Sequence, residues 1–188
     1  MTILAQSIDG EAVTTKLAMR MEDSLQAFAV RAACFMGEMD VPFSEEFDGH
    51  DFGATHVIAY VGEEPVGTVR VRWFQSFAKP ERLAVIQRYR GHNIGQVLLE
   101  RCRKLAETRG CNMLYVQVLP GDLSYWEKMG WRRLVSEETS SGAKQIVAMV
   151  KAVDPSKPLP DVEAPEVVVL RPEPQLDSSG RPLSSASN

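Results

Sequence analysis

The chain has 188 residues, of which 44% are hydrophobic and 24% charged, the composition of a globular domain with room for a tail. Its net charge of −4 argues against nucleic acid as the main partner. No apolar run approaches the roughly 20 residues that span a bilayer, and the N-terminus lacks a signal-peptide pattern, so we expect a cytoplasmic protein with no membrane partner. Three cysteines stand far apart in apolar surroundings and predict reduced core residues, with no metal site: Cys34, Cys102 and Cys111.

A helix is the first element with a clear signal. Residues 17–21 predict a first strand, and Asp23 is then a candidate N-cap. Apolar side chains recur at helical spacing from Leu25 to Phe35, which predicts a core-packing helix that ends near Gly37.

An acidic stretch follows, with six carboxylates between positions 38 and 51. A charge run of this kind favours a solvated loop. Aromatic residues are interleaved with the acids, however, so parts of the loop are expected to pack against the domain. A partly buried acidic loop would attract a cationic amine and could take its proton, which makes Glu38, Glu46 and Asp48 candidate substrate-binding residues.

The middle of the chain predicts a hairpin and then a strand, a turn and a helix. Residues 56–61 and 67–74 are expected to form two antiparallel strands, because the residues between them supply turn chemistry. Residues 75–80 predict a loop. A buried strand at 83–86 and a turn with Gly91 and Gly95 then lead into an amphipathic helix from Ile94 to about Gly110.

The turn at 90–96 has a chemical use. The first amides of a helix have no partner inside it, and a tight loop would point the amides of Gly91 to Gln96 inward, as a site for phosphate or pyrophosphate. Arg88 and Arg90 would add positive charge at its rim. The plainer interpretation is an ordinary strand-to-helix turn that needs glycine for its geometry.

The last third predicts short elements and a tail. A strand is expected at 111–119, a short helix at 123–129, and strands at 131–135 and 145–153 joined by a polar turn at 139–142. Residues 154–188 hold seven of the eleven prolines, which predicts a disordered tail. Its apolar patch at 167–170 could add to a sheet edge or bind a protein partner, whereas an unstructured solubilising tail is the plainer interpretation.

The central turn carries a family resemblance. Residues 85–95 read Val-Ile-Gln-Arg-Tyr-Arg-Gly-His-Asn-Ile-Gly and precede a leucine-rich helix. They resemble the acyl-CoA-binding motif of the GNAT acetyltransferases, with Asn93 where the first glycine of a Gly-x-Gly core is usual, and Asn tolerates a left-handed backbone. The resemblance implies acetyl-CoA as co-substrate, no metal, and these cofactor-binding residues: Ala84, Val85, Ile86, Arg90, Gly91, His92, Asn93, Ile94, Gly95, Gln96 and Trp126.

The short helix departs from the same family. From residue 125 it reads Tyr-Trp-Glu-Lys-Met-Gly-Trp, which resembles Phe-Tyr-Glu-Lys-x-Gly-Phe, whose Tyr protonates the leaving CoA thiolate in many GNAT enzymes. That Tyr falls on Trp126, and an indole N–H is not a usable acid. Three outcomes stay open: Tyr125 takes the role from a shifted helix, water supplies the proton, or the chain binds acyl-CoA and catalyses poorly.

The resemblance covers residues 15–153, and the front half, from Arg31 to a strand-opening His56, is similar to the ElaA/YjcF-like branch. It implies an α/β fold with a mixed, mostly antiparallel central sheet flanked by helices, in a domain at 1–153 before a disordered tail at 154–188. It also implies an N-acetyltransferase that moves an acetyl group from acetyl-CoA to a primary amine of a small molecule or protein, by direct attack in a ternary complex.

The resemblance also suggests catalytic roles for particular residues, and other functions stay open as alternatives. Glu81 ranks first as the base because it lies just upstream on the central strand, ahead of His56 and Glu38, and Tyr125 is the candidate acid. Two alternatives are a non-catalytic acyl-CoA sensor or scaffold and a protein similar to acyl-homoserine-lactone synthases. A homodimer is a further hypothesis.

Overall fold

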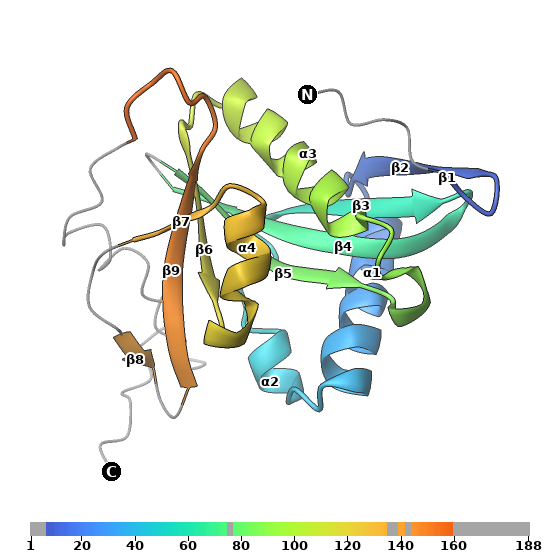
Figure 1. Ribbon diagram of the computed structural model, residues 1–188. Coiled ribbons are helices and arrows are strands. Elements are labelled where there is room, and N and C mark those ends of the chain that lie inside the picture. The colour runs from blue at the N-terminus through green and yellow to red at the C-terminus, as the bar shows by residue number, and fades with distance from the viewer. Residues whose placement is uncertain (1–6, 75–76, 135–138, 142–143, 160–188) are drawn as a thin grey trace, which may run out of the picture.

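The computed structural model describes residues 7–74, 77–134, 139–141 and 144–159. Within these residues the strands form a nine-stranded sheet in the order β1-β2-β3-β4-β5-β6-β9-β7, with β8 paired to β9 (Figure 1). Neighbouring strands are antiparallel except β5 and β6, which are parallel. The strands are β1 (Ser7–Ile8), β2 (Glu11–Leu17), β3 (Thr55–Val61), β4 (Glu64–Trp73), β5 (Phe77–Val85), β6 (Met113–Val118), β7 (Arg132–Arg133), β8 (Thr139–Ser141) and β9 (Lys144–Ala152).

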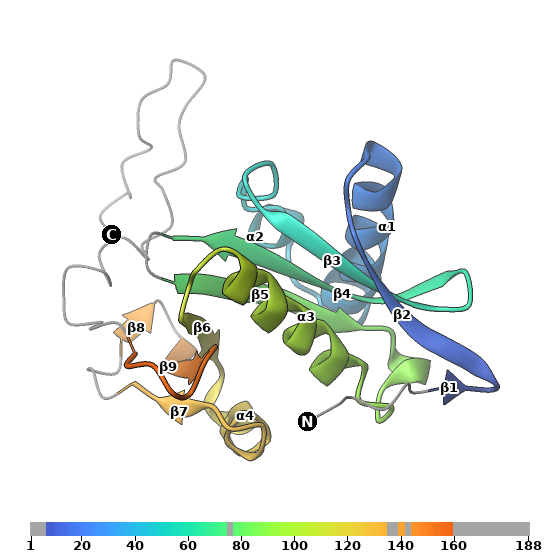
Figure 2. The same ribbon diagram turned by 90° about the horizontal axis from the view of Figure 1, so that it is seen from above.

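Helices cover both faces of the sheet. Figure 2 shows α1 and α2 on one face and α3 on the other. The α-helices are α1 (Met21–Arg31), α2 (Phe43–Glu46), α3 (Ile94–Thr108) and α4 (Leu123–Lys128). A π-helix, η1 (Ala32–Glu38), continues α1, and short 3-10 turns lie at η2 (Gln87–Tyr89) and η3 (Pro120–Asp122). The predicted mixed, mostly antiparallel sheet flanked by helices is confirmed.

The main core lies between α3 and the sheet. Ile94, Leu98 and Cys102 recur on one side of α3 and are buried against alternate residues of β4, Val69 and Val71. The period of 3.6 in the helix and the period of 2 in the strand present these apolar rows to each other. The arginines that alternate with these valines therefore point to the other face of the sheet, under α1 and α2.

Several predicted boundaries are wrong. The strand predicted at 17–21 lies earlier, at Glu11–Leu17, and follows the two-residue β1. Helix α1 begins at Met21, and Asp23 reaches back from inside its first turn to accept from the amides of Met19 and Arg20. The predicted loop at 75–80 ends early, since β5 already begins at Phe77. The predicted turn at 139–142 holds β8, which pairs with β9. The tail patch at 167–170 lies outside the described residues.

Candidate active site

The loop between β5 and α3 is a turn with two residues in the left-handed conformation. Gly91 has φ +83° and Asn93 has φ +55°, so both take the left-handed backbone, and Asn93 precedes α3 directly. The amides of Gln96 and Val97 donate to the Asn93 carbonyl. Among the described residues, the amides of Ile94 and Gly95 have no backbone acceptor, so they can bind an anion at the start of a 15-residue helix.

Arg90 fixes this loop to two neighbouring elements. Its Nε donates to the Val85 carbonyl at 2.9 Å, and its guanidinium lies 2.5 Å from a carboxylate oxygen of Glu38. Glu38, a predicted substrate-binding residue, is therefore paired with a predicted cofactor-binding residue. His92 lies exposed beside it, with Nδ1 3.1 Å from the Arg90 carbonyl.

Beside the loop, Arg88 belongs to a small surface group. Arg88 and the Tyr89 hydroxyl both contact Glu64. A shallow pocket opens next to them, lined by Ile8, Asp9, Arg88, Tyr89 and His92. The positive charge at the rim of the loop is thus supplied by Arg88 and Arg90, each paired with one carboxylate.

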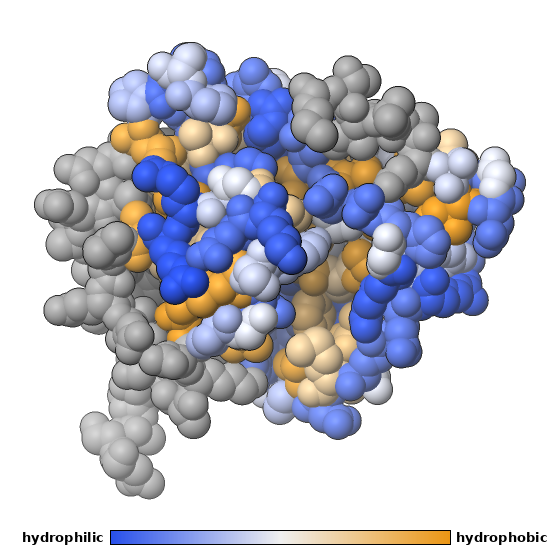
Figure 3. Space-filling view, viewed as in Figure 1, coloured by the Kyte–Doolittle hydropathy of each residue, from blue (hydrophilic) through white to orange (hydrophobic). Residues whose placement is uncertain are grey.

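The two parallel strands separate soon after they meet. β5 pairs with β6 only at Phe77 with Met113 and at Ala78 with Leu114. Beyond these pairs the ribbons diverge beside α4 (Figure 1). Figure 3 shows apolar side chains at the centre of this face, between hydrophilic areas on either side. β5 from Lys79 onward therefore has an edge without a strand partner among the described residues.

Glu81 lies on β5 next to an irregular part of this strand. Arg82 has φ +53°, and Val69 of β4 stands opposite two residues of β5, because Thr68 pairs with Ala84 while Arg70 pairs with Glu81. The Glu81 carboxylate is 3.1 Å from Arg70, 3.3 Å from Lys79 and 3.7 Å from Arg72. The candidate base is thus surrounded by three cations and only partly exposed.

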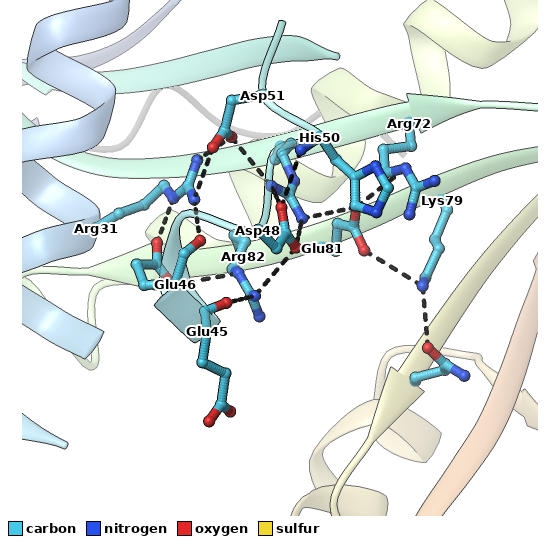
Figure 4. Close-up of polar contacts among 12 residues, drawn as sticks. Arg31, Glu45, Glu46, Asp48, His50, Asp51, Arg72, Lys79, Glu81 and Arg82 are labelled. Carbon is cyan, nitrogen blue, oxygen red and sulfur yellow. Dashed lines mark hydrogen bonds and ion pairs between the residues drawn. The ribbon is translucent and has the colours of Figure 1, made fainter. Parts of the chain in front are cut away.

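Three carboxylates of the acidic loop, those of Glu46, Asp48 and Asp51, point toward arginine side chains (Figure 4). Glu46 is fully buried and contacts Arg31 at 2.5 Å and Arg82 at 3.2 Å. Asp48 accepts two bonds of 2.7 Å from the Arg70 guanidinium. Although burial raises the pKa of Asp48, the hydrogen bond and charge of Arg70 hold it well below its usual range.

These carboxylates of the loop have partners within the protein, and their role in substrate binding stays a prediction. They were expected to attract a cationic amine, but arginines of α1, β4 and β5 already neutralise Glu46, Asp48 and Asp51. Glu46 has no exposed side-chain surface. The alternation of Arg70 and Arg72 with apolar residues predicts a polar face on this strand. The sequence spacing does not predict that Arg31 of α1 contacts the same group of carboxylates.

His56 lies behind the same cluster. It is buried, its Nε2 is 3.2 Å from the Asp51 carbonyl, and its ring meets Phe28 edge to face. Burial lowers its pKa, which favours the neutral ring. A role as a base through water stays a prediction.

The two aromatic residues of α4 point in different directions. Trp126 packs into the main core and meets Trp131 edge to face, with ring centroids 5.1 Å apart. Tyr125 reaches α3 instead, since a Cβ built on Gly95 would lie 3.1 Å from its hydroxyl. Burial raises the pKa of Tyr125, whose hydroxyl lies beside the turn at 90–96.

Within the described residues, no helix is both long and apolar enough to cross a membrane. Known proteins share sequence and fold with this chain. The chain is 30% identical over 122 residues to "Uncharacterized N-acetyltransferase YjcF" of Bacillus subtilis (strain 168), which is 65% of this chain and 87% of that protein. The fold matches Escherichia coli ElaA with a TM-score of 0.63 at 16% identity, over 74% of this chain and 99% of ElaA.

A further solved structure of this fold is an aminoglycoside 6'-N-acetyltransferase complexed with coenzyme A. It matches with a TM-score of 0.62 at 15% identity, over 78% of this chain and 98% of that one. Residues 20–131 match the family model described as "Acetyltransferase (GNAT) family". The chain belongs to the GNAT family of acetyltransferases.

Proposed function

We propose that this chain transfers an acetyl group from acetyl-CoA to a primary amine by direct attack in a ternary complex. The observation that carries the proposal is the turn at 90–96, where the amides of Ile94 and Gly95 have no backbone acceptor in the described part of the chain and follow two left-handed residues. Such a turn suits the pyrophosphate of CoA. The coenzyme A in the related aminoglycoside acetyltransferase supports this choice of ligand.

In this proposal the pantetheine arm lies along the edge of β5 that β6 leaves unpaired. The backbone of Ala84 to Ile86 lies between the Glu81 region and the turn, so it would position the thioester close to both. Placing the two reactants side by side supplies much of the rate enhancement in a reaction of this type.

The amine nitrogen attacks the thioester carbonyl carbon, and the C–S bond breaks once the C–N bond has formed. The proton released by the amine passes to Glu81, directly or through water, and Tyr125 protonates the departing thiolate. The place of Tyr125 next to Gly95 supports this role, while Trp126 is occupied in the core. Both observations favour an enzyme over a non-catalytic acyl-CoA sensor.

The proposal is tested by calorimetric titration of acetyl-CoA into the intact chain and into Gly95→Glu. Gly95 is a buried helical residue whose added side chain would first meet the flexible end of Tyr125, so the variant introduces a negative charge beside the turn. Circular dichroism checks that it folds. We expect micromolar binding to the intact chain and at least about a hundredfold loss in the variant, as the charge-assisted bonds of the pyrophosphate would be lost.

Gly53→Glu is the matched control, because it adds the same charge at an exposed glycine with nothing within 4 Å. Its affinity for acetyl-CoA is expected to equal that of the unaltered chain. Equal affinity of Gly95→Glu and the unaltered chain would show that the turn is not the CoA site.

A further inference from the structure

The polar cluster under α1 and α2 divides into a balanced part and an unbalanced part. In the balanced part, the carboxylates of Glu46, Asp48 and Asp51 face the guanidinium groups of Arg31, Arg70 and Arg82, at distances from 2.5 to 3.2 Å (Figure 4). Each of these acids thus has an arginine partner, and each arginine has an acid.

The unbalanced part lies toward β6. Arg72 of β4 and Lys79 of β5 are register partners, and both face Glu81. Lys79 Nζ is 3.3 Å from the Glu81 carboxylate. It is also 3.0 Å from the side-chain oxygen of Gln117 on β6, but this amide carries no charge. Arg72 comes no closer than 3.7 Å to Glu81 and stacks over the Phe74 ring. Because Arg70 also lies 3.1 Å from Glu81, three cations share this one carboxylate.

The surplus positive charge is largely removed from water. The side chain of Arg72 is 14% exposed and that of Lys79 is 8% exposed. Burial lowers the pKa of Lys79 even though Glu81 raises it, and burial together with the charge of Arg72 lowers the pKa of the neighbouring His50. The carboxylate of Glu45 points away from the cluster in Figure 4. Among the described residues, the Arg72 guanidinium has no hydrogen-bond acceptor.

We propose that Arg72 and Lys79 bind a carboxylate of the acceptor, so that the acceptor is a free amino acid or a similarly short amino-carboxylic acid. This inference rests on the proposed function, because Glu81 marks where the amine would lose its proton. Both cations lie within 3.7 Å of Glu81, so the amine and the carboxylate must be only a few bonds apart. A polyamine would instead place further positive charge next to Arg72 and Lys79, and the like charges would repel.

The experiment compares matched acceptors. Turnover of acetyl-CoA is followed by release of free thiol with each of the common L-amino acids, with the amide of each, and with putrescine and spermidine. We expect an acid to exceed its own amide by about ten- to hundredfold in kcat/KM, the worth of one charge-assisted contact. The polyamines are expected to be poor acceptors.

Arg72→Gln and Lys79→Gln are expected to raise the KM of the acid about tenfold or more, with little change for the amide, whereas Arg72→Lys keeps the charge and part of the preference. The control is Lys104→Gln, which removes one positive charge from an exposed position on α3. Circular dichroism checks that each variant is folded.

Acids and amides used equally well, or polyamines preferred, would overturn the inference and leave the proposed function standing. If no amine is turned over, the complex with CoA is titrated with N-acetyl amino acids and their amides, and an equal response to both overturns it as well. A chain that does not bind acetyl-CoA in calorimetry would overturn the proposed function itself, and this inference with it.

Discussion

Single residues decide how the chain departs from the usual GNAT motifs. Asn93 takes the left-handed conformation that a glycine usually supplies, as expected from the tolerance of Asn for positive φ. The Tyr-Trp pair on α4 could be aligned with the family, but its orientation could not be predicted. Whether Tyr125 or Trp126 faces the turn depends on the packing of α4 against Trp131, which a sequence pattern does not contain.

Removing the Tyr125 hydroxyl tests its role as the acid. Tyr125→Phe is expected to lower kcat by about 10²- to 10⁴-fold, the range for general acid catalysis, with little change in the KM for acetyl-CoA. Tyr60→Phe is the control, because it removes a hydroxyl that contacts Gln26 on α1, away from the turn. Steady-state thiol release measures both variants. If kcat of Tyr125→Phe is unchanged, water and not Tyr125 protonates the departing thiolate.

At the scale of elements, α1 and the acidic loop are joined to the sheet by buried charge. The period of the apolar residues predicts the helix, the turn chemistry between two strands predicts the hairpin, and both are confirmed. The length of β5 was missed because Lys79 and Pro80 interrupt the apolar pattern. Pro is tolerated there because β5 has already left β6, and Lys79 is buried by its contact with Gln117. Such long-range pairings have no local signal.

Substitution of Arg31 measures how much the buried ion pairs between α1, the acidic loop and the sheet contribute to stability. Arg31→Met leaves Glu46 buried without its closest cation, so we expect about 3–5 kcal/mol less free energy of unfolding in urea. Arg31→Met/Glu46→Leu should recover part of that loss, because it removes the orphaned charge. Arg103→Met breaks surface pairs on α3 and should cost about 1 kcal/mol or less. Equal losses for Arg31→Met and Arg103→Met would contradict a structural role for the cluster.

For the whole molecule, the titratable groups predict a stability that falls in two stages on acidification. Burial lowers the pKa of His50 and of His56, so below about pH 6.5 the unfolded chain takes up protons first and stability falls. Burial raises the pKa of Asp48 and Asp51, but their arginine bonds outweigh it and lower both. Their contribution is present above about pH 4 and is lost as the pH falls further.

Urea unfolding at pH 7.5, 5.5 and 3.5 measures both stages. His56→Gln should flatten the change between pH 7.5 and 5.5, while His92→Gln, at an exposed position, should leave it in place. A stability that does not change between these two pH values would show that His50 and His56 contribute nothing to it.

The brief pairing of β5 with β6 has a mechanical consequence. The rows of backbone hydrogen bonds on either side of it are long, but only two residue pairs join them. The half of the sheet that ends at β5 and the half that begins at β6 are therefore coupled mainly through the packed side chains of α3 and α4. If the pantetheine arm of the thioester lies along β5, it would hydrogen-bond to the part of this strand that β6 leaves unpaired. The bound co-substrate would then also stiffen the junction between the two halves of the sheet.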